Sequence, residues 1–169
     1  MIDPGFLTQT RLFEEFTPGE AATAAARFAV RACRPGEAVV SEGRPADHLY
    51  LIKSGAFRVT RTFGDNVLTV ATLNPHDHFG EMSLIDEHPH SATVVADGEG
   101  ELLTLSRADL RALLAESDSM RAKFWQAIAI ELTRRIRSTT NTVRDYVGIN
   151  KALCENDKFR EFYILCNSH

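Results

Sequence analysis

The sequence predicts a mainly β fold: a jelly-roll barrel, or double-stranded β-helix, with helices before it and one long dimerisation helix after it. Short segments rich in β-branched and aromatic residues follow one another between residues 38 and 105, separated by turn dipeptides such as Pro35-Gly36 and Ser54-Gly55. A helix-start signal precedes these segments. An apolar repeat with alternating spacings of three and four follows them.

The first part of the chain is expected to be helical, over about residues 8–32. Thr17-Pro18-Gly19-Glu20 has the pattern of a capping box with proline at the first helical position. Residues 21–32 are rich in alanine and therefore favour a helix.

From Arg34 onward the sequence changes to short strands. Those expected to be extended are residues 38–40, 48–52, 57–60, 67–73 and 102–105. Glycine, proline, asparagine and aspartate separate them at close and regular intervals, which is typical of a β-sandwich or jelly roll.

The most informative stretch is residues 79–94. Phe79-Gly80-Glu81 opens a short apolar run that is long enough for one or two helical turns. A polar turn with Pro89 follows, and a β-branched strand begins near Ser91.

The chemistry of this stretch points to a phosphate-bearing ligand. A glycine such as Gly80, just ahead of a helical turn, lets a ligand approach the backbone closely. The free N–H groups at a helix start bind anions, phosphate above all. Glu81 would repel a phosphate, so its natural task is to accept hydrogen bonds from a sugar hydroxyl.

The two halves, Phe79-Gly80-Glu81 and Pro89-His90-Ser91-Ala92-Thr93-Val94, resemble the phosphate-binding cassette of the cyclic nucleotide-binding domain family. Residues 42–55 also match the family pattern closely. In one departure, His90 replaces the arginine with which the family grips the cyclic phosphate. The resemblance implies a ligand site formed in this part of the chain by Phe79, Gly80, Glu81, Met82, Ser83, His90, Ser91 and Ala92.

A long helix is expected from about Met120 to Val147. Its repeat forms a seam consisting of Trp125, Ile128, Leu132, Ile136, Thr139, Val143 and Tyr146. A coiled-coil-like seam on an isolated helix needs a partner, so we expect a parallel homodimer. We also expect a downstream protein partner, whose identity the sequence does not specify.

Residues 132–143 resemble the dimer helix of the bacterial catabolite-activator (Crp/Fnr) branch of the family. The resemblance implies that Thr139 and Thr140 contact the base, one from each subunit, and that Arg135 lies near the cassette glutamate. The alternative is that both threonines are only polar seam residues.

The predicted domains are residues 1–118 for the barrel with its N-terminal helices, 119–147 for the dimerisation helix, and 148–169 for a short tail of unknown role. The tail is too short for a helix-turn-helix domain. Because the formal net charge is -4 and the pI is about 5.9, we expect no specific DNA binding.

Composition is ordinary for a soluble protein, with 44% hydrophobic and 25% charged residues. No stretch approaches the roughly 18 apolar residues of a membrane span, and residues 1–9 lack the features of a signal peptide. The three cysteines, at no metal-like spacing, are typical of reduced thiols. We therefore expect a cytoplasmic protein without a membrane partner.

Other chemistry is less well supported. His76-x-His78 and His88-x-His90 flank Glu81, which would suit a metal-dependent enzyme similar to the cupins. A haem sensor is another alternative, whereas an iron–sulfur cluster needs more cysteines. No nucleophile with a recognisable base and no glycine-rich nucleoside triphosphate loop is visible.

The sequence therefore predicts a non-enzymatic sensor that binds cyclic AMP or cyclic GMP and has neither a cofactor nor a metal. The alternative is a degenerate domain that binds no nucleotide and serves as a dimerising interaction module.

Overall fold

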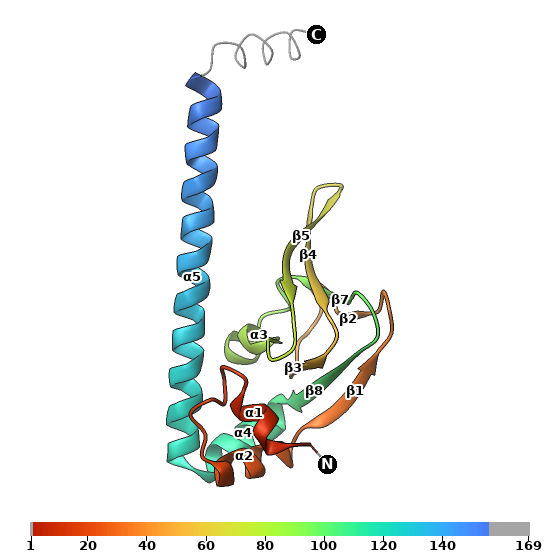
Figure 1. Cartoon of the computed structure of the whole chain (residues 1–169), viewed down its shortest axis with the longest axis vertical. Helices are drawn as coiled ribbons and strands as arrows, with labels where there is room; N and C mark the ends of the chain where they lie inside the picture. Colours follow the sequence, from red (N-terminus) through yellow and green to blue (C-terminus); the bar gives the residue numbers. More distant parts are fainter. Residues whose placement is uncertain (1, 156–169) are drawn as a thin grey trace. The chain divides into compact units, whose positions relative to one another are not determined.

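The structure is a computed structural model of the chain and describes residues 2–155 (Figure 1). The chain divides into two compact units, Met1–Ala127 and Ile128–His169. The helices are α1 (Pro4–Thr8), α2 (Pro18–Ala25), α3 (Glu81–Asp86), α4 (Arg107–Glu116) and α5 (Asp118–Glu155). The strands are β1 (Ala29–Cys33), β2 (Ala38–Val40), β3 (His48–Ser54), β4 (Phe57–Phe63), β5 (Asn66–Leu73), β6 (His78–Phe79), β7 (Thr93–Ala96) and β8 (Gly100–Ser106).

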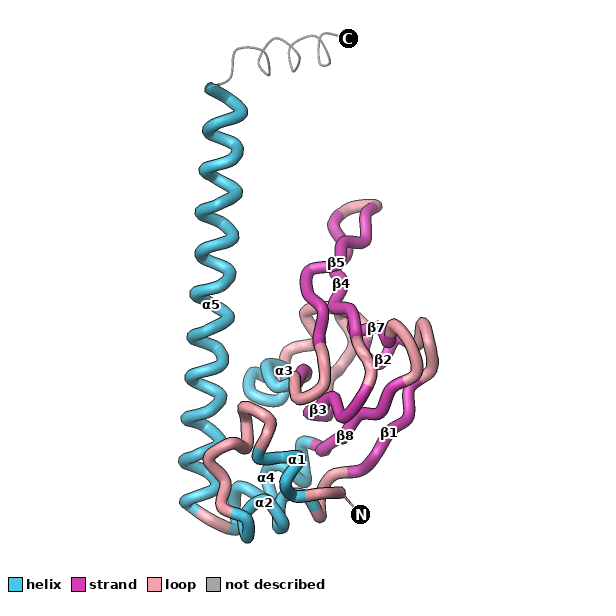
Figure 2. The backbone as a smooth tube through the Cα atoms, viewed as in Figure 1, coloured by secondary structure: helices cyan, strands magenta, loops and turns pink. Residues whose placement is uncertain are grey.

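These strands form two antiparallel sheets, in the orders β1-β8-β3-β6 and β2-β7-β4-β5 (Figure 2). The predicted mainly β, jelly-roll-like fold with flanking helices and a long C-terminal helix is therefore confirmed. Within the described residues, the two sheets are hydrogen-bonded separately and do not close into one barrel.

Side chains from both sheets fill the space between them. Alternation along β7 shows how: Val94 and Ala96 are buried, while Thr93 and Val95 are partly exposed. The buried cluster consists of Cys33, Val39, Val40, Tyr50, Ile52, Phe57, Phe79, Val94, Ala96 and Leu102. Removing this apolar surface from water is the main stabilising contribution to the fold.

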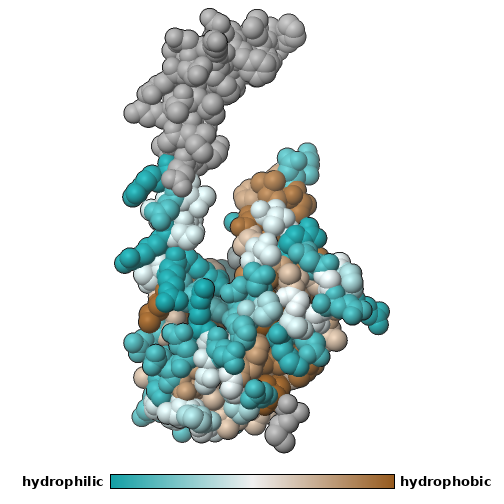
Figure 3. Space-filling view, in the orientation of Figure 1, coloured by the Kyte–Doolittle hydropathy of each residue, from teal (hydrophilic) through white to brown (hydrophobic). Residues whose placement is uncertain are grey.

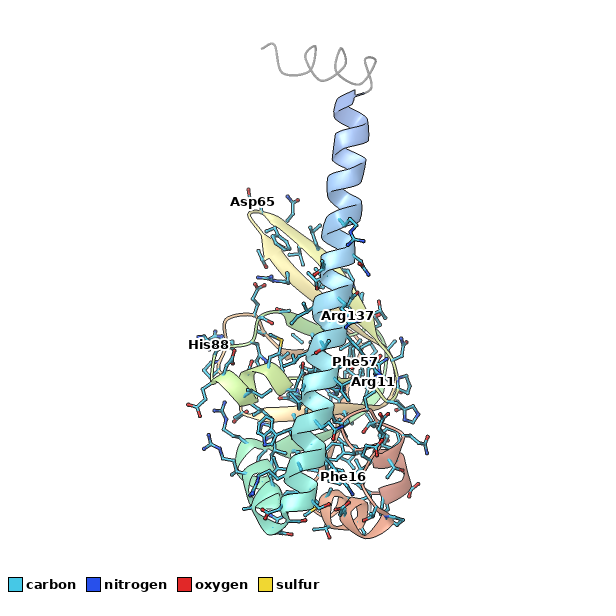
Figure 4. The ribbon with its side chains drawn as sticks, turned by 90° about the vertical axis from the view of Figure 1, so that its left-hand side faces the viewer. Arg11, Phe16, Phe57, Asp65, His88 and Arg137 are labelled. Carbon is cyan, nitrogen blue, oxygen red and sulfur yellow. The ribbon has the colours of Figure 1, made fainter. Side chains whose placement is uncertain are left out.

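The β4–β5 hairpin extends beyond this core. All residues from 61 to 72 are exposed, including several large apolar side chains. Figure 3 shows the hairpin as an apolar surface, and Figure 4 places Asp65 at its tip. Phe63 lies under the Arg61 guanidinium, whose carbon is 5.4 Å from the ring centroid.

The N-terminal part is less helical than expected. The capping box is present, because the Glu20 amide donates to Thr17 Oγ1 and the Thr17 amide donates to Glu20 Oε2. However, α2 ends at Ala25, and residues 29–32, which were expected to be helical, lie in β1. Five residues of β1 pair with β8, and this tertiary pairing outweighs the local helix propensity of alanine.

The long C-terminal helix begins close to the predicted residue and continues further than predicted. The Ser106 hydroxyl accepts a hydrogen bond from the Asp109 amide and caps α4. Helix α5 does not end near Val147 but runs to Glu155. A single glycine in a helix interior costs only about 1 kcal/mol, so Gly148 does not end it. The rest of the expected tail, residues 156–169, lies outside the described residues.

A carboxylate joins α2 to the start of α5. Glu20 accepts hydrogen bonds from the Ser119 hydroxyl at 2.7 Å and from Lys123 Nζ at 2.7 Å. These contacts, led by that with Lys123, lower the pKa of Glu20 to about 2. Among the described residues, no helix is long and apolar enough to cross a membrane.

Candidate functional site

The stretch predicted to bind a ligand begins at a backbone conformation that favours glycine. Gly80 precedes α3 with φ of 87°. A Cβ atom at this position would lie 2.6 Å from the His48 carbonyl oxygen and 3.2 Å from Tyr50 Cδ2. Only a residue without a side chain fits here without strain.

The side chains of α3 divide into buried and exposed groups. Glu81, the first helical residue, is only 2% exposed, and Ser83 and Leu84 are also buried. Met82 is 44% exposed and faces solvent. A buried carboxylate is stable only when hydrogen-bond donors or cations compensate it, and Glu81 is not without such an interaction in the fold.

Phe79 anchors the start of this segment in the core. Its ring stacks on Tyr50, with centroids 4.7 Å apart and an interplanar angle of 7°. Phe57 also lies nearby, with its ring centroid 6.4 Å from that of Phe79. Phe79 is therefore a packing residue that fixes the position of Gly80, rather than a polar ligand contact.

His90 is held by its backbone on both sides. Its amide donates to the Arg44 carbonyl at 2.9 Å, and its carbonyl accepts from the Gly43 amide at 2.8 Å. The residue is 8% exposed. Burial lowers the pKa of His90, and the Asp47 carboxylate opposes that shift. The imidazole is therefore mostly neutral at pH 7.

The two residues after His90 are more accessible. Ser91 is exposed and Ala92 is partly exposed, and β7 begins at Thr93. The residues from Gly80 to Ala92 thus offer backbone groups and one hydroxyl at the surface, beside a buried carboxylate.

Sequence reasoning missed Arg107, the first residue of α4. Its guanidinium donates to the carbonyl oxygens of Ala46 and Ser83 and forms an ion pair with Glu87. The sequence does contain one signal for Arg107. A cation in the first turn of a helix is electrostatically unfavourable, which indicates that its side chain makes favourable contacts elsewhere.

The histidines do not assemble a metal site. Across residues 2–155, no group of three or more His, Cys, Asp or Glu side chains is placed to hold a metal ion. His88 lies on the exposed turn after α3 (Figure 4) and contacts Asp86. His76 is partly buried and stacks on Phe6, with ring centroids 4.8 Å apart. The structure therefore gives the metal alternative no ligand set in the part it describes.

The helix residues predicted to contact a ligand belong to the second unit. Arg135 Nε lies 3.4 Å from Glu131 Oε1, one turn earlier in α5. Thr139 and Thr140 are exposed, and the Thr140 hydroxyl donates to the Ile136 carbonyl. Their part in a nucleotide site stays a prediction.

Comparison with known proteins defines the class. The model of the family described as "Cyclic nucleotide-binding domain" matches residues 30–117. This match covers more than half of the chain, and the chain belongs to that family.

The particular relatives are regulators. A "Cyclic AMP receptor protein" from Thermus thermophilus is 40% identical over 104 residues, which are 61% of this chain and 48% of that protein. A "cAMP-dependent protein kinase regulatory subunit" from Yarrowia lipolytica is 34% identical over 65% of this chain and 29% of its own length. The crystal structure of the Thermus thermophilus Catabolite Activator Protein has a TM-score of 0.74 and 34% identity, over 85% of this chain and 66% of that chain. The chain spans about half the length of the first curated relatives it matches.

Proposed function

We propose that this protein is a non-enzymatic sensor that binds cyclic AMP, or cyclic GMP, in the segment from Phe79 to Ala92. The single observation that carries this proposal is Gly80, held in a left-handed conformation against the His48 carbonyl and directly followed by the buried Glu81. In this proposal the backbone amides would bind the phosphate, and the Glu81 carboxylate would accept a hydrogen bond from a ribose hydroxyl. The names of the relatives at 40% and 34% identity support the same ligand class.

The direct test is calorimetric titration with cyclic AMP, cyclic GMP and linear AMP. We expect binding of a cyclic nucleotide and much weaker binding of linear AMP. Because a hydrogen bond to a charged group is worth about 1.5–3 kcal/mol, Glu81→Ala should weaken binding roughly ten- to a hundredfold. The matched control is Asp86→Ala, which removes an exposed carboxylate from the same helix.

A ligand that lacks the 2′-hydroxyl gives the discriminating result. If Glu81 accepts the ribose hydroxyl, Glu81→Ala should lose less affinity for the deoxyribose ligand than for the ribose ligand. Equal losses for both ligands would show that Glu81 has another task. A wild-type protein that binds neither cyclic nucleotide at any pH would refute the proposed function.

We further propose that the protein is a homodimer, with a ligand-binding part at residues 1–118 and a dimerisation helix at residues 119–147. Along the predicted seam, Ile128 is only 4% exposed in a single copy, whereas Trp125 is 43% and Ile136 is 66% exposed. These exposed apolar side chains favour burial against a second helix. In this proposal Thr139 and Thr140 contact the base and Arg135 lies near Glu81.

One observation favours a second candidate function. His90 replaces the phosphate-gripping arginine, and its burial keeps it mostly neutral at pH 7. A domain that has lost nucleotide binding would act as a dimerising interaction module. The titration described above separates the two candidates.

A further inference from the structure

Arg107 occupies a position that its own helix does not favour. It is the first residue of α4, where the exposed N–H groups give the helix a partial positive charge. Its side chain is nevertheless only 22% exposed and forms an ion pair with Glu87. The reason for a cation here must therefore lie in what the guanidinium contacts.

Three acceptors surround the guanidinium. Nη2 donates to the Ala46 carbonyl at 2.7 Å and to the Ser83 carbonyl at 3.0 Å. Nη1 lies 3.0 Å from Glu87 Oε1. The backbone amide of Arg107 adds a 2.7 Å hydrogen bond to the Asp47 carbonyl. One residue thus joins α4, α3 and the segment that leads into β3.

The contact with α3 compensates a weakness of that helix. The last four carbonyl groups of a helix have no intrahelical partner, and in α3 these begin with Ser83. Glu87 then leaves the helix in the left-handed conformation, with φ of 59°. A cation that caps this end satisfies a carbonyl and has a favourable interaction with the helix dipole.

We propose that Arg107 is a positioning residue for the ligand site. By holding the end of α3 against residues 46–47, it fixes the place of Glu81 and of the backbone groups around Gly80. This inference rests on the proposed function for its effect on affinity, but its effect on α3 does not require a ligand. The forked guanidinium suits this task, because a lysine ammonium is a point charge that lacks its planar, two-pronged set of donors.

The test measures amide hydrogen exchange in the full chain without ligand, followed by titration with cyclic AMP. Arg107→Lys should raise exchange in residues 81–90 at least about tenfold and weaken cyclic AMP binding by about tenfold. Arg111→Gln is the matched control, because Arg111 lies in the same helix and also pairs with Glu87, at 2.9 Å. Arg111 and Glu87 side chains are 69% and 62% exposed, so this loss should have little effect.

The outcomes separate positioning from general support. Unchanged exchange in residues 81–90 of Arg107→Lys overturns the inference. A rise spread equally over β3 and β8 also overturns it, because Arg107 would then act only as a support of the fold. If the wild type binds no cyclic nucleotide, the proposed function fails, while the exchange result still decides the role of Arg107.

A second measurement covers the case in which Arg107→Lys does not fold. In the wild type, nuclear magnetic resonance of the arginine side chains should show separate, slowly exchanging Nη–H signals for Arg107, because three acceptors restrict its rotation. A single averaged signal, like that of the exposed Arg111, would overturn the inference.

Discussion

His90 allows the sharpest test of the site. Burial lowers the pKa of its imidazole in the unliganded protein, below the ordinary value of 6.5. A phosphate bound beside it would favour the charged form and raise that pKa. Binding therefore takes up a proton in part of the molecules, and affinity for cyclic AMP should rise as pH falls from about 8 to about 6.

The size of the effect follows from the pKa change. Each unit of difference between free and bound pKa values is worth about 1.36 kcal/mol, so a rise of one unit allows at most about a tenfold gain in affinity at low pH. Because protonation of His90 is incomplete at both ends of the pH range, the expected gain in affinity stays below that limit. The gain is limited because charging His90 must overcome its burial, at 8% exposure.

Two variants complete the experiment, which is calorimetric titration at several pH values. His90→Arg should bind more tightly by roughly 1–2 kcal/mol and lose the pH dependence, since arginine stays charged. His90→Gln should bind weakly at low pH and show a flat profile. A wild type that binds tightly with a flat pH profile would refute the reasoning, because His90 would then point away from the phosphate.

The same lowered pKa has the opposite effect on the unliganded domain. A group whose folded-state pKa is depressed contributes stability above its unfolded value, which is lost as pH falls through the folded value. The unliganded protein should therefore lose some stability as pH falls below about 6.5. A lower pH should thus strengthen ligand binding but destabilise the protein that has no ligand.

Three further results are expected. Gly80→Ala should destabilise the domain by at least about 1–2 kcal/mol in denaturant unfolding. Gly19→Ala should not, because nothing lies within 4 Å of the Cβ atom that it would add. Equal losses of stability in the two variants would refute the close contact of Gly80 with His48. Glu20→Gln should lower the free energy of unfolding by about 1 kcal/mol at pH 7. This difference in stability from the wild type should vanish as pH falls from the unfolded-state pKa of 4.5 towards the folded-state pKa of about 2. A difference in stability that is independent of pH would contradict this prediction. Ile136→Asp should give monomers in light scattering. Ser138→Asp, on the opposite side of α5, should stay dimeric. A wild-type protein that is monomeric would disprove the proposed dimer.

The sequence allowed the cassette to be located because its signals are local. Gly80 needs its conformation for the turn itself, and Glu81 follows it directly, so spacing along the chain is enough to predict them. Helix α3 and the strand that begins at Thr93 were expected for the same reason. Local chemistry also predicted the cap at Thr17.

Features that depend on distant contacts were not predictable in the same way. Residues 29–32 have an alanine-rich context that favours a helix, but pairing with β8 makes them a strand. Arg107 reaches acceptors 24 and 61 residues away in the chain. His76 stacks on Phe6, which lies far from it in sequence and gave no sign of the contact. Each depends on a chain path that the local pattern does not specify.

Burial of Cys33 has a practical consequence for thiol chemistry. The side chain lies in the core between the sheets at 3% exposure, and burial raises the pKa of its thiol. Only the thiolate reacts quickly with alkylating reagents, so Cys33 is shielded both sterically and by its protonation. In a protein whose other two cysteines, Cys154 and Cys166, are changed to serine, alkylation of Cys33 would proceed only when the sheets part. The rate at which Cys33 is alkylated, followed by mass spectrometry, therefore measures how often the domain opens.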